Sequence, residues 1–256
     1  MRKFCSYGPV NTELHYYVPR TALVNRTRNQ LVGENPAGGG HYITVWAPRQ
    51  AGKTWVMQQV LWQLREDDRF DVLKLNLEHL KMARSVSRVV RDIARRITEG
   101  VGVADVPVRV LDDFHEVFRR GVLERPLILI LDEFDALSPT AIAGIASVLR
   151  NIYVQRQDQA DRPSEERDYL LHGVALVGVR AVLGIESQTG SPFNVQRSVH
   201  IPNLTPTEVR EMYNWYAWES GQRVEPEVIE RVYHETRGQP GLVSWLGELL
   251  TEEFNR

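Results

Sequence analysis

Two hydrophobic patterns alternate along the first 200 residues. Short apolar runs rich in β-branched residues predict strands at 41–47, 71–78, 126–134, 169–180 and 198–204. Apolar residues recurring every three or four positions predict helices at 22–31, 53–66, 84–97, 108–122 and 140–155. The run at 127–131 is wholly aliphatic, which is typical of a strand buried on both faces of a sheet. The alternation predicts an α/β fold with a five-stranded parallel sheet between helices.

The pattern changes at residue 205, after which three helical segments follow with no further strand. A small all-helical domain is therefore expected at 205–256, after an α/β core at 41–204. Residues 1–40 form an N-terminal region with one helix, and a glycine-rich connector at 33–40 leads into the core. A charged stretch at 156–168 reads as a loop.

Composition narrows the class of protein. Of the 256 residues, 43% are hydrophobic and 25% are charged, as expected of a globular chain with a real core. The formal net charge of −2 gives no bulk attraction to nucleic acid or to an anionic membrane. A single cysteine, Cys5, excludes a disulfide framework and favours a reducing cytoplasm. No apolar run is long enough to cross a bilayer, and no secretory signal is visible.

The junction between the strand at 41–47 and the next helix carries the first candidate chemistry. Its sequence, APRQAGKT, is a Walker A loop with alanine in place of the first glycine. Backbone N–H groups of such a loop cradle phosphate oxygens, Lys53 reaches the β- and γ-phosphates, and Thr54 places a hydroxyl on Mg²⁺. A chance Gly-Lys-Thr is the alternative. The candidate nucleotide contacts are Pro48, Arg49, Gln50, Ala51, Gly52, Lys53, Thr54 and Trp55.

The end of the buried strand at 126–134 carries the second set of candidate catalytic residues. Asp132 and Glu133 stand where the carboxyl ends of parallel strands open, as does the phosphate loop. Asp132 is the expected Walker B ligand of Mg²⁺, and Glu133 the expected general base for the attacking water. Two solvated acids at a strand end are the alternative. Asp135 is expected to cap a helix or to lie on the surface.

No guanine-reading Asn-Lys-x-Asp and no Leu-Ser-Gly-Gly-Gln signature is present. An Asp-Glu pair favours ATP hydrolases that have an extra strand between the two Walker strands. On these motifs the chain resembles the AAA+ and STAND groups of P-loop (ASCE) ATPases, and most of all prokaryotic AAA-like ATPases related to STAND and origin-recognition proteins. The resemblance implies ATP and Mg²⁺ as cofactors and a C-terminal helical lid.

The resemblance also implies roles for residues outside the Walker motifs. YYVPRTAL resembles the N-terminal box that borders adenine, which would involve Val18, Pro19 and Arg20, although Pro19 and Thr21 depart from its usual Gly and acid. VALVGVR resembles a STAND sensor strand whose final arginine, Arg180, would contact the γ-phosphate. TRGQPG resembles the Gly-x-Pro box of the lid, with Gly238 and Pro240.

Arg197 stands where AAA+ proteins often carry an arginine finger that acts on a neighbour's ATP, and a role within its own chain or on the surface is the alternative. Five cations spaced by three and four residues are expected on one helix face, as a contact for DNA or for an acidic partner or as a solvated face. They are Lys81, Arg84, Arg88, Arg91 and Arg95.

The leading expectation is an ATP-hydrolysing switch whose nucleotide state sets lid closure and regulates a separate effector protein or a homo-oligomer. A DNA-associated oligomeric ATPase that binds double-stranded DNA is the first alternative. A nucleotide-binding scaffold with little turnover is the second, and a small-molecule kinase is the least supported. No membrane partner is expected.

Overall fold

The protein is represented by a computed structural model that describes residues 1–178 and 197–253. The chain divides into two compact units. The sheet unit comprises Val24–Trp46 and Met57–His200. The helical unit comprises Met1–Leu23, Ala47–Val56 and Ile201–Arg256. Each unit is described by itself.

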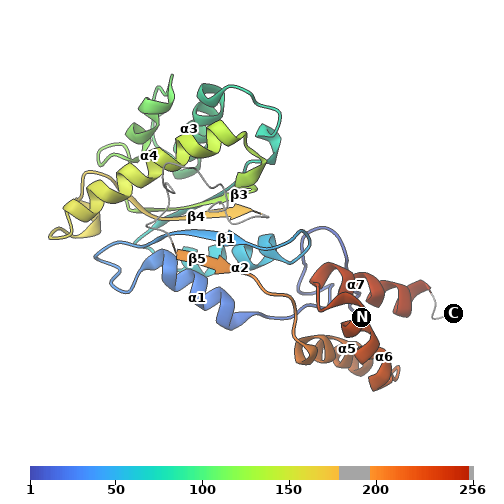
Figure 1. The fold of residues 1–256 in the computed structure, drawn as a ribbon. Helices are drawn as coiled ribbons and strands as arrows, with labels where there is room; N and C mark the ends of the chain where they lie inside the picture. Colours follow the sequence, from blue (N-terminus) through green and yellow to red (C-terminus); the bar gives the residue numbers. More distant parts are fainter. Residues whose placement is uncertain (179–196, 254–256) are drawn as a thin grey trace. The chain divides into compact units, whose positions relative to one another are not determined.

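The sheet unit is built on five parallel strands, as the sequence predicts (Figure 1). They are β1 (Tyr42–Trp46), β2 (Asp71–Asn76), β3 (Leu127–Asp132), β4 (Leu171–Gly178) and β5 (Arg197–His200). Their order across the sheet is β2-β3-β4-β1-β5. β4 therefore lies between β1 and β3, which is the extra strand between the two Walker strands that the sequence motifs predict.

Helices cover both faces of this sheet, with α3 and α4 on one face and α1 and α2 on the other (Figure 1). Their bounds are α1 (Thr21–Val32), α2 (Lys53–Arg65), α3 (Val86–Val101) and α4 (Pro139–Asp158). Short 3₁₀ turns lie at Glu78–Leu80, Phe134–Ala136 and Ser164–Glu166. The helix predicted at 108–122 is instead a 3₁₀ segment, Leu111–Phe118. It still buries Phe114, Val117 and Phe118, because tertiary packing overrides the weak local preference.

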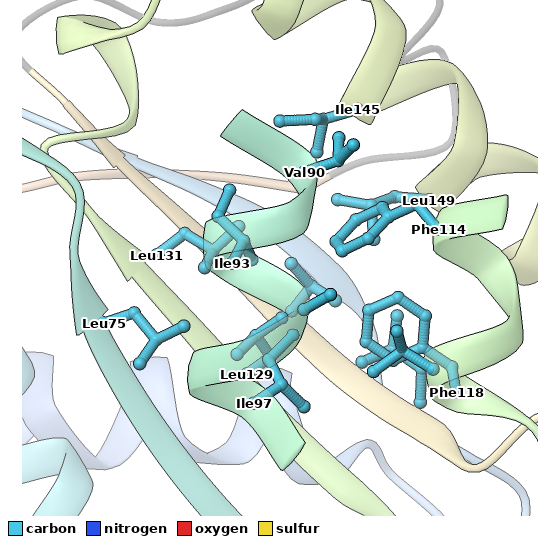
Figure 2. Packing of buried hydrophobic residues seen from close by; sticks show 14 of the residues in the cluster. Leu75, Val90, Ile93, Ile97, Phe114, Phe118, Leu129, Leu131, Ile145 and Leu149 are labelled. Atoms are coloured by element: carbon cyan, nitrogen blue, oxygen red, sulfur yellow. The ribbon is translucent and has the colours of Figure 1, made fainter. Parts of the chain in front are cut away.

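The main core fills the space between the sheet and the α3–α4 face. Figure 2 shows Ile93 and Ile97 of α3 lying toward Leu129 and Leu131 of β3, and all four side chains are fully buried. α3 is fixed at both ends, since the Ser85 hydroxyl accepts a hydrogen bond from the Arg88 N–H and Gly102 closes the helix with a left-handed backbone.

The helical unit contains α5 (Pro206–Ser220), α6 (Pro226–Thr236), α7 (Pro240–Glu248) and a π-helical turn at Leu249–Glu253. Thr205 and Glu208 form a reciprocal capping box at the start of α5. The core of this unit is rich in tyrosine, with Tyr213 and Tyr216 of α5 buried beside Val243 of α7.

The N-terminal residues complete this helical core. The Phe4 ring packs 4.8 Å from the ring of Tyr213, and Tyr16 is buried beside it. A Cβ added at Gly247 would lie 2.3 Å from the Phe4 ring, so only glycine leaves room for it. The guanidinium of Arg2 pairs with Glu219 and lies over the ring of Trp215. Residues 1–23 therefore belong with the C-terminal helices, whereas the sequence suggests a separate region at 1–40.

Within the described residues, no helix is both long and apolar enough to cross a membrane.

Candidate nucleotide-binding site

The loop after β1 has the backbone that a phosphate loop requires. It leaves β1 at Trp46 and enters α2 at Lys53, as the sequence predicts. Gln50 and Gly52 both have left-handed backbones, with φ of 59° and 82°. A non-glycine residue rarely adopts that conformation, and such outliers cluster at ligand sites. No heavy atom lies within 4 Å of a Cβ built on Gly52, so the space beside it is open.

Lys53 is held by its own loop. Its side chain is buried, and its ammonium donates hydrogen bonds of 3.0 Å to the carbonyl oxygens of Ala47 and of Pro48. An ammonium has three N–H donors and no acceptor, so two of them are used within the loop. The next residue, Thr54, is exposed at the first turn of α2.

The start of α7 is hydrogen-bonded to the same loop, within the helical unit. The Gln239 amide donates to the Arg49 carbonyl at 3.0 Å, and the Gly241 N–H donates to the Gln50 carbonyl at 3.0 Å. A Cβ on Gly241 would lie 2.7 Å from that of Gln50, so glycine is needed for this approach. Sequence reasoning assigned no role to Gln239 or Gly241. Their only signal is that they flank Pro240.

The Gly-x-Pro box forms the turn into α7. Gly238 has φ of 72°, and a Cβ there would lie 1.9 Å from the Leu204 carbonyl oxygen. The Leu204 N–H donates to the Gly238 carbonyl at 2.7 Å. Pro240 occupies the first turn of α7, where its missing N–H costs no hydrogen bond. Arg237, which has a left-handed backbone, caps the end of α6, so this stretch both ends α6 and leads into α7 beside the loop.

The N-terminal box lies in the same unit, and its most informative residue is one that the sequence did not single out. The ring of Tyr17 packs edge-on against Trp55 at 5.7 Å and against Trp215 at 5.8 Å. Tyr17 therefore joins the residue that follows Thr54 to α5. A tyrosine before a weak motif carries no distinctive sequence signal.

The three named residues of the box are placed differently from one another. Val18 packs against the helical core, and Pro19 is exposed. Arg20 donates to the Asn203 carbonyl at 3.2 Å and lies 3.8 Å from a Glu208 carboxylate oxygen. Burial lowers the pKa of Arg20, and the nearby Glu208 partly offsets this. Whether these residues border a base stays a prediction.

The carboxyl edge of the sheet buries one acid. Asp132 is the last residue of β3 and is 1% exposed, and one of its oxygens lies 3.2 Å from the ammonium of Lys74 on β2. Its other oxygen accepts the N–H of Glu133 at 3.1 Å. Sequence reasoning missed Lys74, although a lysine inside an otherwise apolar strand is a signal for a buried partner.

Glu133 turns sharply away from the strand. It has φ of 55°, a left-handed backbone that is strained for a non-glycine residue, and its side chain is half-buried. Asp135 is also half-buried, and its carboxyl carbon would lie 2.9 Å from a Cβ on Gly178 at the end of β4. Asp135 lies inside the 3₁₀ turn Phe134–Ala136, whose N-cap is Glu133, so it does not cap that turn. It packs at the carboxyl edge, where Gly178 has no side chain to exclude it.

The two arginines assigned to catalysis do not join this edge in the described residues. Arg180 lies outside them. Arg197 opens β5 in register with Ile43, at the start of the strands, and donates to Gln30 and Glu34 at 3.0 Å each. Ile43 of β1 is in register with Ala175 of β4, and Ala175 is in register with Ile130 of β3. Arg197 on β5 is therefore three strand spacings, of about 4.8 Å each, away from β3.

The expected row of five cations on one helix face is wrong in part. Lys81 and Arg84 precede α3, which begins at Val86, because Ser85 caps the helix there. Arg91 donates to the Val108 carbonyl, and Arg95 pairs with Asp92 and Glu99. The remaining three of these five, Lys81, Arg84 and Arg88, are exposed, and their side chains bind no described residue.

The residues suit a nucleotide that brings its own metal ligands. Within the described residues, no group of three or more His, Cys, Asp or Glu side chains could hold a metal ion. Mg²⁺ needs no such group, because it is usually held by one or two carboxylates, water and the phosphates of the substrate. Asp132, buried at the end of β3, is a carboxylate of the kind that such a metal site uses.

Comparison with known proteins supports the same class. Residues 38–162 match the family model described as an AAA domain. None of the curated proteins matches the chain by sequence. Solved structures share its fold at low identity, and the three described here are all longer than this chain. The chain is similar to the ORC1 protein of Aeropyrum pernix, solved in complex with DNA, with 18% identity and a TM-score of 0.56 over 92% of this chain and 61% of that one.

A Walker-type ATPase of Pyrococcus abyssi has 13% identity and a TM-score of 0.60, over 97% of this chain and 71% of that one. A RuvB variant of Thermotoga maritima has 15% identity and a TM-score of 0.54, over 93% and 63%. The chain thus spans about three fifths of the length of ORC1 and RuvB. The fold is that of the P-loop NTPases, with the Walker-type sequences at the ends of β1 and β3. Residues 38–162 are similar in sequence to an AAA domain, and the ORC1 protein shares the fold.

Proposed function

We propose that this chain binds ATP with Mg²⁺ at the loop Ala47–Thr54, hydrolyses it, and passes the state of the nucleotide to the helices α5–α7. The observation that carries the proposal is the hydrogen bonding of the loop. Its Arg49 and Gln50 carbonyls are bound by the start of α7, and its Ala47 and Pro48 carbonyls are bound by Lys53. One loop thus joins the phosphate-binding lysine to the lid.

Binding would change the partners of this loop. Lys53 would exchange the Ala47 and Pro48 carbonyls for phosphate oxygens, since charge-assisted hydrogen bonds are the stronger ones. The loop N–H groups would donate to the same phosphates. Because the carbonyls of Arg49 and Gln50 belong to the same peptide chain, a shift of the loop would alter the two bonds to α7.

The carboxyl edge would supply the chemistry. β1 and β3 are parallel, so the chain leaves Trp46 for the loop at the same edge at which Asp132 and Glu133 end β3. Asp132 would take a share of Mg²⁺, and the ion would replace Lys74 as the neighbouring positive charge. Glu133 would accept a proton from the attacking water, which raises its nucleophilicity. Mg²⁺, when bound, neutralises charge on the phosphates.

Phosphate release from ATP tests the hydrolysis. Glu133→Gln should lose turnover while it still binds ATP, because the amide cannot accept the proton. Glu166→Gln, at an exposed glutamate far along the chain, is the matched control and should keep the rate. Equal rates in the wild type and Glu133→Gln would refute the role of Glu133. ATP that stays bound with no phosphate release by the wild type would instead indicate a nucleotide-binding scaffold.

Hydrogen exchange tests the coupling to α7. In Glu133→Gln, which should hold ATP without cleaving it, the backbone amides of residues 239 and 241–243 should change protection when ATP is added. Gln239→Ala, which removes one bond to the loop, should reduce that change. Unaltered exchange with saturating ATP would show that the loop does not signal to α7.

A second function, association with double-stranded DNA, is favoured by one surface of the sheet unit. Met82 is 85% exposed between Lys81 and Arg84, and Arg88 is exposed nearby on α3. Cations attract the phosphate backbone, and an exposed apolar side chain among them can contact bases or sugars. The similar ORC1 protein was solved with DNA, which supports the same partner here.

Duplex binding measured over a series of salt concentrations tests this surface. Arg84→Glu and Arg88→Glu should each weaken binding and lower the salt slope by about 1. Arg95→Glu is the control, since Arg95 already pairs with Asp92 and Glu99. Light scattering with and without ATP would separate an oligomer from a monomer that serves a separate effector. Arg197 acting on a neighbour's ATP would have to leave Glu34 first.

A further inference from the structure

The amino edge of the sheet unit buries two arginines, and no buried acid of the described residues pairs with them; burial lowers the pKa of Arg167, and the exposed Asp161 partly offsets this. Arg156 lies near the end of α4 and Arg167 follows the 3₁₀ turn Ser164–Glu166, and they are 3% and 1% exposed. Neither forms an ion pair with a carboxylate of the described residues. This edge is opposite to Asp132, because β1 and β4 begin here at Tyr42 and Leu171 whereas Asp132 ends the parallel strand β3.

Neutral groups satisfy part of Arg156. Its guanidinium donates to the Tyr169 carbonyl and, at 2.7 Å, to the Ser164 hydroxyl oxygen. His172 lies behind the serine, with Nε2 2.9 Å from the Val32 carbonyl and Nδ1 2.9 Å from the Ser164 oxygen. A carbonyl only accepts, so Nε2 carries the proton and Nδ1 accepts the serine proton. The serine oxygen is then free to accept from Arg156.

The hydrogen bonds that link His172, Ser164 and Arg156 bring no negative charge to the arginines. Burial is the main cause that lowers the pKa of His172 to about 4, so the imidazole is neutral at physiological pH. Burial likewise lowers the pKa of Arg156 to about 10, which still leaves the guanidinium charged there. Two positive charges therefore remain inside this edge of the sheet.

Arg167 has more unsatisfied hydrogen-bond donors than Arg156. Its Nε donates to the Arg162 carbonyl at 3.1 Å, whereas Nη1 and Nη2 are buried and bind no described residue. Buried donors of a charged group cost more to leave unsatisfied than neutral ones, and such groups usually hold a water or an ion. A second buried cation beside it increases the cost.

The two guanidinium groups converge on the glycine loop at 38–40. A Cβ on Gly39 would lie 3.2 Å from Nη1 of Arg167 and 3.4 Å from Nη2 of Arg156. Gly39 has φ of 110°, a conformation that glycine alone adopts readily. The loop is tied to its surroundings by the Gly40 N–H on the His172 carbonyl and by the Ser164 N–H on the Ala37 carbonyl. It covers the arginines with backbone alone.

We propose that Arg156 and Arg167, beneath the glycine loop 38–40, bind a small oxyanion at the amino edge of the sheet. Guanidinium forks match the geometry of phosphate and similar oxyanions, and the charge-assisted bonds would satisfy the donors that Arg167 leaves open. No Cβ stands over the two guanidinium groups at Gly39, because glycine occupies that position. The site is independent of the nucleotide loop.

Inorganic phosphate is the probe, and the experiment uses Lys53→Ala so that the nucleotide loop contributes little. Thermal unfolding is followed as phosphate replaces chloride at constant ionic strength. The melting temperature should rise and then saturate, and isothermal titration should give one site. Arg167→Met in the same background should weaken that site at least tenfold, by about 1.4 kcal/mol or more.

Controls keep the result decisive. Arg162→Met changes an exposed neighbour whose carbonyl still accepts from Arg167, so it should bind phosphate as the parent does. Arg167→Lys keeps the charge but loses the fork, so it should bind more weakly than the parent, and it replaces Arg167→Met should that variant fail to fold. A response equal in the parent and the Arg167 variants, or no response beyond that of chloride, would overturn the proposal and leave water as the partner of Arg167.

Discussion

The two edges of the sheet bury charge in opposite ways. At the carboxyl edge, Asp132 is buried against Lys74, so the pair is neutral within the chain. At the amino edge, the hydrogen-bond acceptors of buried Arg156 and Arg167 are all neutral, and neither arginine forms an ion pair with a described residue. At the first edge the proposed Mg²⁺ would replace Lys74 as the counter-ion, whereas at the second edge no carboxylate of the described residues forms an ion pair with the arginines. A buried charge therefore indicates a ligand most clearly where the chain does not supply its own counter-ion.

The largest effect on stability is expected from breaking the neutral pair. Lys74→Met leaves Asp132 buried without its cation and should lower the free energy of unfolding by about 3 kcal/mol. Urea unfolding at neutral pH measures it. The double variant Lys74→Met/Asp132→Asn should recover most of the loss, because no charge remains. A single variant as stable as the wild type would mean that the pair is open to solvent.

The next effect is a pH dependence at the amino edge. The unfolded chain protonates a histidine near pH 6.5, but folded His172 does so only near pH 4. Between these values protonation favours the unfolded chain, so the free energy of unfolding should fall by up to about 3 kcal/mol as the pH drops from 6.5 to 4. The facing groups Arg156, Arg167 and Arg69 add to this shift.

Urea unfolding across this pH range, in the wild type and in His172→Gln, isolates the histidine. The variant should lack this part of the pH dependence, and His234→Gln, at an exposed site, should retain it. Parallel pH profiles for the wild type and His172→Gln would contradict the assignment of a neutral buried imidazole.

The smallest effect sharpens the comparison most. In chloride without phosphate, Arg167→Met should change the free energy of unfolding by less than about 1 kcal/mol, because it removes a buried charge together with one hydrogen bond. Lys74→Met should be far more harmful, although both replace a buried cation with methionine. Equal losses would show that Arg167 is already neutralised by a partner in the free protein.

The sequence predicts the carboxyl edge better than the amino edge. Walker motifs give Lys53 and Asp132 directly, because their spacing is local and their strand and helix context is strongly patterned. Arg156 and Arg167 fall in a stretch that reads as a charged loop at 156–168. Their burial depends on α4 continuing to Asp158 and on the glycine loop from a distant part of the chain. Tertiary contacts of this kind leave no local periodicity.

The helical unit shows the same limit. Three helices after residue 205 follow from periodicity and from the Thr205–Glu208 capping box. The inclusion of Phe4 and Tyr16 in their core does not, since it pairs positions about 200 residues apart. The contact of Gln239 and Gly241 with the loop is hidden for the same reason, because backbone carbonyls are the acceptors and any residue could supply them.

Isothermal titration with ATP, with and without Mg²⁺, tests whether the chain binds a nucleotide through Lys53 and Asp132. The wild type should bind one ATP, and more tightly with Mg²⁺. Lys53→Ala should bind at least about tenfold more weakly, since it loses charge-assisted bonds to the phosphates. Asp132→Asn should lose most of the benefit of Mg²⁺. A wild type that binds no ATP, or a Lys53→Ala variant that binds it equally well, would contradict the account.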